Sequence, residues 1–141
     1  MFALGKRSLD NLEGIHPDLV KVLTNAIIDS PCDFTITEGV RTSQRQQELY
    51  AQGRTKPGNI VTNRDGIKNK SEHQPKDDGY GYAVDLYPYF NGSVQLSHKD
   101  TPKKQREIAD HILMIAKELG INVEAGINWK NPFDPPHFEL K

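Results

Sequence analysis

A long polar stretch from Arg54 to Tyr80 is the feature that most constrains how this chain can fold. The stretch is rich in Lys, Asn, Asp, Gly and Pro and has few apolar positions, which is typical of surface loops rather than of helices or strands. The segments that build the core must therefore lie before and after it. Loops of this length in a small domain are often functional, so we expect part of a site here.

Regular apolar patterns flank the polar stretch on both sides. Apolar residues recur at helical spacing in two segments, and Ser43 is suited to cap a shorter helix between them. Period-two alternation indicates short strands elsewhere. Because helices and strands are segregated along the chain, the pattern predicts a small α+β domain with helices packed on an antiparallel sheet. The predicted helices are residues 17–28, 44–52 and 101–119, and the predicted strands are residues 33–37, 82–89, 121–125 and 137–140.

Charge and length exclude several classes of protein. The 141 residues suffice for one domain, and 18 Lys and Arg against 19 Asp and Glu leave a net charge of −1. This balance gives no long-range attraction to nucleic acid, and no apolar run is long enough to insert into a membrane. The N-terminal residues lack the apolar region of a secretory signal, so we expect synthesis in a cytoplasm. The lone Cys32 excludes an internal disulfide and thiolate-rich metal sites, and we expect its side chain to be buried.

Three segments carry residues suited to metal chemistry. Near the end of the chain, Asp134-Pro135-Pro136-His137 places an imidazole three positions after a carboxylate, while His73 lies in the polar stretch and Asp85 in a predicted strand. Two histidines and one aspartate would complete the protein ligand set of a catalytic zinc ion, which keeps one position for water. Taken alone, each histidine is better explained as a solvated or hydrogen-bonded side chain than as a metal ligand, and the spacing does not change this interpretation.

The order of these motifs resembles a known family. Ser71-Glu72-His73, Gly81-Tyr82-Ala83-Val84-Asp85 and Asp134-Pro135-Pro136-His137 are similar to the split zinc signature of the VanY-like D-alanyl-D-alanine carboxypeptidases, the LAS-type zinc peptidases. Within that group the chain most resembles small phage endolysins that act as L-alanyl-D-glutamate peptidases. The resemblance extends over nearly the whole chain. Further matching segments are residues 39–43, 47–54 and 57–62, together with Trp129.

The resemblance implies a fold of the hedgehog and D-Ala-D-Ala peptidase type and a role for each motif residue. It makes His73, Asp85 and His137 the Zn²⁺ ligands and Asp134 the general base and acid.

The same resemblance assigns substrate contacts. Arg41 would be a catalytic cation that holds a substrate oxygen, and an ordinary structural ion pair is the alternative interpretation of this residue. Ser71 and Trp129 are the other expected substrate-binding residues.

One departure from the family pattern affects His73. Relatives commonly place the aspartate seven positions after this histidine, whereas residues 74–80 lengthen the interval to Asp85 to twelve positions. The inserted loop must bulge outward for both ligands to meet, and His98 is the alternative ligand if it does not. Asp77-Asp78-Gly79 within the insertion is most simply a turn, with a second cation or a substrate contact as alternatives.

The resemblance also implies an activity. We expect a zinc-dependent peptidase that cleaves peptidoglycan stem peptides, at the bond between L-alanine and D-glutamate, as a monomeric phage endolysin without a separate cell-wall-binding domain. It would be made in the host cytoplasm and reach the wall after the membrane is breached. A D-Ala-D-Ala carboxypeptidase and a non-catalytic zinc-bearing module that binds wall peptide are the alternatives. The near-neutral charge disfavours a metal-dependent nuclease.

Overall fold

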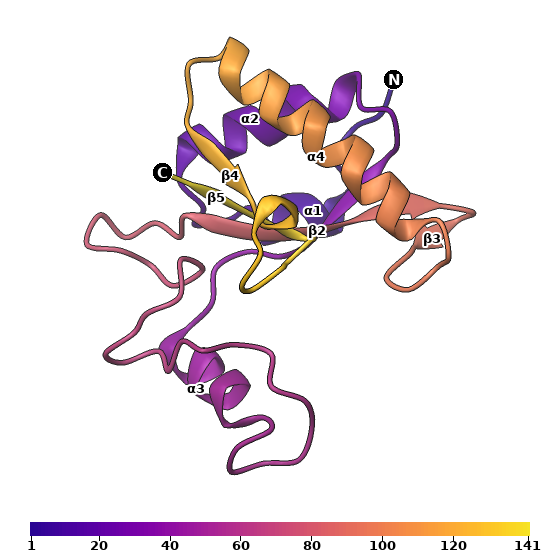
Figure 1. Cartoon of the computed structure of the whole chain (residues 1–141). Coiled ribbons are helices and arrows are strands. Elements are labelled where there is room, and N and C mark those ends of the chain that lie inside the picture. The colour runs from indigo at the N-terminus through magenta and orange to yellow at the C-terminus, as the bar shows by residue number, and fades with distance from the viewer.

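The computed structural model describes residues 1–141 and places every strand in one antiparallel sheet (Figure 1). The strand order is β1-β2-β5-β4, and the short β3 pairs with the end of β2. The helices are α1 (Lys6–Asn11), α2 (Pro17–Ile28), α3 (Ser43–Ala51) and α4 (Thr101–Glu118), the strands are β1 (Phe34–Glu38), β2 (Ala83–Phe90), β3 (Ser93–Val94), β4 (Val123–Ala125) and β5 (His137–Leu140), and a 3₁₀ helix, η1 (Gly126–Asn128), follows β4.

The core lies between the sheet and the pair α2 and α4, which pack on each other and cover one face of the sheet (Figure 1). On α4, Ile108 and Ile112 are fully buried, so the predicted apolar stripe faces the core. Burying side chains of this size stabilises the fold by about 1.5–3 kcal/mol each. Cys32 is buried as expected. The remaining large core side chains include Leu19, Leu23, Phe34, Ile36, Val84, Leu86 and Phe138.

Alternation along β2 and β5 gives the sheet two chemically different faces. Val84 and Phe138 point into the core, so their neighbours Asp85 and His137 point to the opposite face. Asp85 and His137 are also direct partners in the antiparallel register of the two strands. Directly opposed residues have Cβ atoms about 4.5–5.5 Å apart, so the register alone brings this carboxylate and this imidazole together.

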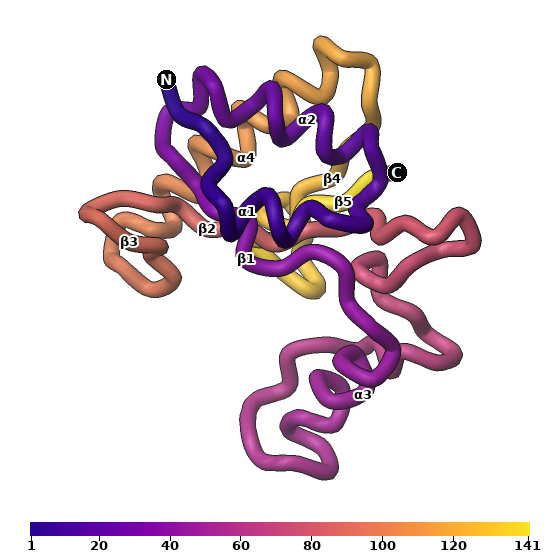
Figure 2. The backbone as a smooth tube through the Cα atoms, turned by 180° about the vertical axis from the view of Figure 1, so that it is seen from behind, coloured from indigo at the N-terminus to yellow at the C-terminus, as the bar shows by residue number.

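The segment between β1 and β2 leaves the sheet and forms a separate lobe built on α3, which both views show projecting away from the core (Figures 1 and 2). We call residues 43–70 the α3 lobe. Gln46 is fully buried at its centre and donates to Thr62 Oγ1 at 3.1 Å and to the Arg64 carbonyl at 2.7 Å. The lobe therefore holds together through buried polar bonds and not through an apolar core of its own.

The first turn of α3 differs from the prediction. Thr42, not Ser43, is the N-cap residue, because its Oγ1 accepts a hydrogen bond from Arg45 N at 3.0 Å. Ser43 is already helical, and its hydroxyl instead donates to the Gly66 carbonyl at 3.3 Å and accepts from Gln74 Nε2 at 3.0 Å. The helix also ends at Ala51, one residue before the predicted end.

Three elements were not predicted, and other boundaries shift slightly. The six-residue helix α1 lies against β1, where the buried Ser8 hydroxyl accepts a hydrogen bond from Ile36 N at 2.9 Å (Figure 2). The strand expected at residues 121–125 begins only at Val123, because Ile121 N still bonds to the Ala116 carbonyl at the end of α4. β3 and η1 are the other unpredicted elements.

No helix in the structure combines the length and the apolar character needed to cross a bilayer.

Candidate metal centre

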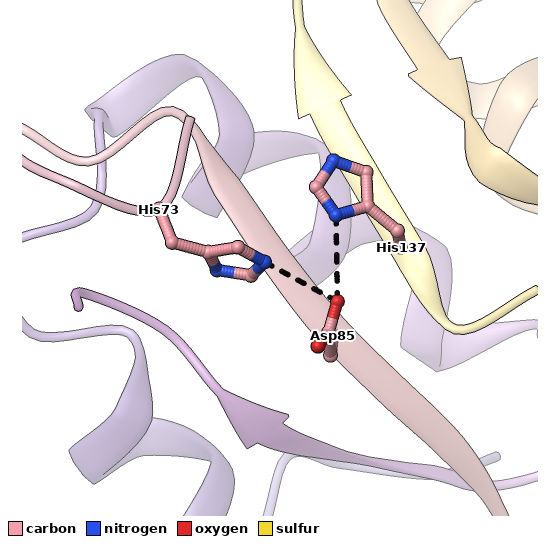
Figure 3. A group of neighbouring side chains, drawn as sticks. All are labelled: His73, Asp85 and His137. Carbon is pink, nitrogen blue, oxygen red and sulfur yellow. Dashed lines mark ion pairs between the residues drawn. The ribbon is translucent and has the colours of Figure 1, made fainter. Parts of the chain in front are cut away.

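Three predicted ligands converge on the sheet face opposite the core (Figure 3). His73 Nε2 lies 3.3 Å from Asp85 Oδ1, and His137 Nδ1 lies 3.5 Å from the same oxygen. One potential ligand atom from each residue lies within 4.8 Å of the other two. They come from the loop before β2, from β2 and from β5, so only the folded chain brings them together.

The loop that carries His73 is fixed by backbone hydrogen bonds. Arg41 N donates to the His73 carbonyl at 2.8 Å, and Tyr82 N donates to the Glu72 carbonyl at 2.9 Å. The second bond joins the two ends of the inserted loop directly before β2. His73 itself is buried, with 2% of its surface exposed.

The insertion after His73 projects outward, as the sequence predicted. Residues 75–80 are all exposed, and Gly79 N donates to the Lys76 carbonyl at 2.8 Å. Asp78 Oδ1 accepts from Tyr80 N at 3.0 Å, which is the behaviour of an aspartate in a turn. The extra residues therefore form a turn outside the site and do not separate His73 from Asp85.

His98, the alternative ligand, lies elsewhere. Its ring packs against Phe90 with centroids 5.0 Å apart, and its Nδ1 accepts from Asp100 N at 3.0 Å. His98 therefore belongs to the turn that precedes α4 and contributes nothing to the centre. The other two histidines are also structural, because His16 caps α2 and His111 bonds to the Ala26 carbonyl.

Hydrogen bonds on the far side of each imidazole orient the ring. His73 Nδ1 lies 3.0 Å from the Gly39 carbonyl, which accepts only from an N–H and so leaves Nε2 to face Asp85. His137 Nε2 lies 2.8 Å from Glu139 Oε1, which leaves Nδ1 to face the same carboxylate. Glu139 was not among the predicted site residues. Its signal was its place two residues after His137, on the same face of the predicted strand.

The pKa shifts of Asp85 and His137 both indicate that this group of side chains attracts positive charge. Burial raises the pKa of Asp85, but the nearby imidazoles of His137 and His73 outweigh this effect and hold the pKa far below its usual range. Burial lowers the pKa of His137, whereas the nearby carboxylates of Asp85 and Glu139 raise it to about 9.

The three side chains have the chemistry that a bound metal ion requires. Asp85 Oδ1 is buried, and although both imidazoles are within ion-pair distance, neither makes a hydrogen bond of good geometry to it. A buried oxygen in this condition is costly unless it is paired or coordinates a metal. With one carboxylate oxygen and two imidazole nitrogens, the three residues form a possible metal site.

Asp134 stands at the edge of this group. Its Oδ2 lies 3.8 Å from His137 Nδ1, and its side chain is 42% exposed. Burial and the charge of Asp85 together raise the pKa of Asp134 above its usual value. Its backbone is fixed by a bond from Asp134 N to the Gly126 carbonyl at 3.0 Å and by a bond from His137 N to the Asp134 carbonyl at 3.1 Å.

Arg41 makes an ion pair and also borders the site. Its guanidinium donates to both carboxylate oxygens of Glu38 at 2.9 Å and to Gln46 Oε1 at 2.7 Å. The residue is buried and lines the same cavity as the three converging ligands. The structural ion pair considered from the sequence is therefore present.

Ser71 and Trp129 both line the same cavity. The Ser71 hydroxyl accepts from His73 N at 3.2 Å, so it also shapes the turn that presents the histidine. The Trp129 ring lies 5.0 Å from the His137 ring, measured between centroids, and its Nε1 donates to Glu124 Oε1 at 3.1 Å.

The cavity lies between the open face of the sheet and the α3 lobe and has a volume of about 1050 Å³. Its apolar contributions from the lobe are Leu49, Ile60 and Val61, of which Ile60 and Val61 are more than half exposed. A hollow of this size is at the upper end of the range of small-molecule binding pockets, and the three predicted ligands lie in its lining.

Comparison with protein families matches residues 1–140 to the phage L-alanyl-D-glutamate peptidases. The chain belongs to this family. Among its relatives, the peptidoglycan L-alanyl-D-glutamate endopeptidase CwlK of Bacillus subtilis is 36% identical over 89% of this chain and 73% of its own length. The L-alanyl-D-glutamate peptidase of Escherichia phage T5 is 33% identical over 99% of this chain and 90% of its own. The family predicted from the motifs is thus confirmed.

Solved structures agree with this assignment. The L-Ala D-Glu endopeptidase ChiX of Serratia marcescens superposes with a TM-score of 0.72 at 31% identity, covering 99% of this chain and 90% of ChiX. The vancomycin resistance D,D-dipeptidase VanXYg shares the fold, with a TM-score of 0.53 and 18% identity over 89% of this chain and 50% of its own. These matches confirm the predicted α+β peptidase fold.

Proposed function

We propose that this chain is a zinc peptidase that hydrolyses the bond between L-alanine and D-glutamate in peptidoglycan stem peptides. The observation that carries the proposal is the convergence of His73, Asp85 and His137 at the cavity, with the carboxylate of Asp134 beside them. Two relatives and one solved structure are named for activity on this bond.

In this proposal His73 Nε2, Asp85 and His137 Nδ1 hold the zinc ion, because these atoms already face one another. The set leaves room for further coordination, as catalytic sites require and structural sites do not. When bound, zinc supplies Lewis acidity, which makes water more acidic and polarises an amide carbonyl.

The protein's own groups would manage the protons and the charge. Asp134 accepts the proton of the attacking water and delivers it to the departing amine nitrogen. The remaining N–H groups of Arg41 donate to the substrate oxygen, while Glu38 and Gln46 keep the guanidinium in place. Trp129 and Ser71 contact the peptide on either side of the reacting bond. Because Arg41 is fixed by three side-chain bonds, little entropy is lost when it binds.

The biological role in this proposal is that of a phage endolysin. The protein acts as a monomer on the peptide part of the bacterial wall once the membrane has been breached, and membership in a phage-type family supports this role.

Mass spectrometry of purified peptidoglycan after digestion tests the proposed reaction. We expect fragments with a new N-terminal D-glutamate and a new C-terminal L-alanine, and we expect none of them after treatment with a zinc chelator. Release of terminal D-alanine instead would identify a D-Ala-D-Ala carboxypeptidase and overturn the proposed bond specificity. Zinc binding without any new terminus would identify a non-catalytic binding module.

A further inference from the structure

Four other side chains surround His137 on the side that faces away from Asp85, and all four line the cavity. His137 Nε2 bonds to Glu139 Oε1 at 2.8 Å, and Lys141 Nζ lies 2.9 Å from Glu139 Oε2. Lys141 Nζ also lies 3.9 Å from Glu124 Oε2, and Glu124 Oε1 accepts from Trp129 Nε1. The indole of Trp129 packs on the imidazole of His137 and completes this group of side chains. We call these five residues the His137 clamp.

Glu139 is the member whose burial needs an explanation. It is 4% exposed, and a buried carboxylate is strongly unfavourable unless it is paired and hydrogen-bonded. Both of its oxygens are in fact satisfied, one by the imidazole of His137 and the other by the ammonium of Lys141. Its carboxylate thus has two partners and little contact with solvent.

The sheet register shows why Lys141 belongs to the clamp. Glu124 on β4 and Glu139 on β5 are direct cross-strand partners, and two like charges in this position repel each other. Lys141 Nζ lies between the two carboxylates and offsets this repulsion. Lys141 therefore allows Glu139 to remain charged beside Glu124 while it bonds to His137.

We propose that Glu139 is a positioning residue that fixes His137 for metal binding, an inference that rests on the proposed function of His137 as a zinc ligand. By accepting a hydrogen bond from Nε2–H, the carboxylate selects the tautomer of the neutral imidazole in which Nδ1 is the unprotonated nitrogen, and it holds Nδ1 turned toward Asp85. It also makes Nδ1 a stronger donor to a metal. Partners of this kind typically contribute 10–100-fold to metal affinity.

Metal affinity of the full chain, measured by competition with a chromogenic zinc chelator in the absence of substrate, tests the proposal. Glu139→Ala removes the acceptor, Glu139→Gln keeps an oxygen of the same shape without the charge, and Glu118→Ala is the matched control on the exposed end of α4. We expect the zinc Kd to rise by about 10–100-fold in Glu139→Ala and by less in Glu139→Gln, with no change in Glu118→Ala.

The visible spectrum of the cobalt-substituted proteins provides a second readout, because it reports the geometry of the ligands and not the stability of the fold. We expect Glu139→Gln to keep the band positions of the unmodified protein and Glu139→Ala to lose them. A Kd for Glu139→Ala within twofold of the unmodified value, in a folded protein, would overturn the positioning role.

The Kd comparison is independent of the cleavage assay. Should the unmodified protein bind zinc and fail to cleave wall peptide, the proposed function would be wrong while the comparison of Glu139 variants would still decide the role of this residue.

Discussion

Asp134 is the residue on which the proposed chemistry depends most directly. Its backbone makes two hydrogen bonds that fix its place before β5, while its carboxylate makes none and is partly exposed toward the cavity. A side chain held in this way contributes little to the fold and is free to exchange a proton with a ligand in the site. Function and stability are therefore separable at this position.

Replacing Asp134 by Asn should leave folding and zinc binding unchanged and reduce kcat by about 10²–10⁴-fold, since the amide cannot accept the proton of water. The measurement is steady-state cleavage of a purified stem peptide, together with zinc content by mass spectrometry. Asp29→Asn on the exposed end of α2 is the matched control. Turnover of Asp134→Asn equal to that of the control would exclude Asp134 from the mechanism.

At the scale of elements, backbone packing sets the position of Asp134. Gly126 begins η1 directly after β4, and a Cβ built on it would lie 2.2 Å from the Asp134 carbonyl oxygen. Since real Cβ atoms do not approach a backbone oxygen so closely, the turn before β5 would have to move.

We therefore expect Gly126→Ala to lower kcat by at least about tenfold through displacement of Asp134, a loss comparable to other small misplacements of catalytic groups. Gly5→Ala, where a new Cβ meets nothing within 4 Å, is the control and should be neutral. Cleavage kinetics on the stem peptide provide the comparison. A Gly126→Ala enzyme with unchanged kcat would show that the turn tolerates the shift.

The α3 lobe depends on one buried amide. Gln46→Ala would leave Arg41 NH1 and the Arg64 carbonyl without their partner, and an unsatisfied buried group costs about 1–3 kcal/mol. We expect lower stability in urea unfolding and faster hydrogen exchange in residues 43–70. Gln47→Ala, on the exposed side of the same helix, should have no effect. Equal stability of the two variants would contradict this role of Gln46.

The elements also show what the sequence could predict. The apolar periodicity of α2 and α4 and the alternation of β2 and β5 follow from burial, so pattern alone located them. The proposed metal ligands required the resemblance, because His73 lies in a loop without periodicity. Thr42 as the cap and Glu139 as the partner of His137 were missed, since neighbouring polar residues compete for each role and only the folded register decides between them.

At the scale of the whole molecule, the proposed metal centre brings together three distant parts of the chain. The loop before β2, β2 itself and β5 each supply one ligand, and the unfolded chain cannot present them together. A ligand that binds only the folded state stabilises it by mass action.

Removing zinc should therefore lower the stability of the entire domain. At free zinc about 100 times the Kd, binding contributes about 2.7 kcal/mol, which for a chain of this size corresponds to a rise in Tm of roughly 10 °C. Thermal unfolding followed by circular dichroism with zinc and with a chelator measures the difference. His73→Ala should unfold at the same temperature in both conditions. A Tm of the unmodified protein that does not respond to zinc would argue against the centre.

The bond between Tyr82 N and the Glu72 carbonyl has a practical consequence for protein engineering. It joins the two ends of the protruding turn at residues 75–80. A sequence inserted at the tip of this turn should therefore leave the positions of His73 and Asp85 unchanged. Affinity tags or foreign recognition peptides inserted there would extend into solvent while the hydrolytic apparatus stays intact. This turn is thus a natural attachment point for retargeting the enzyme to a chosen surface.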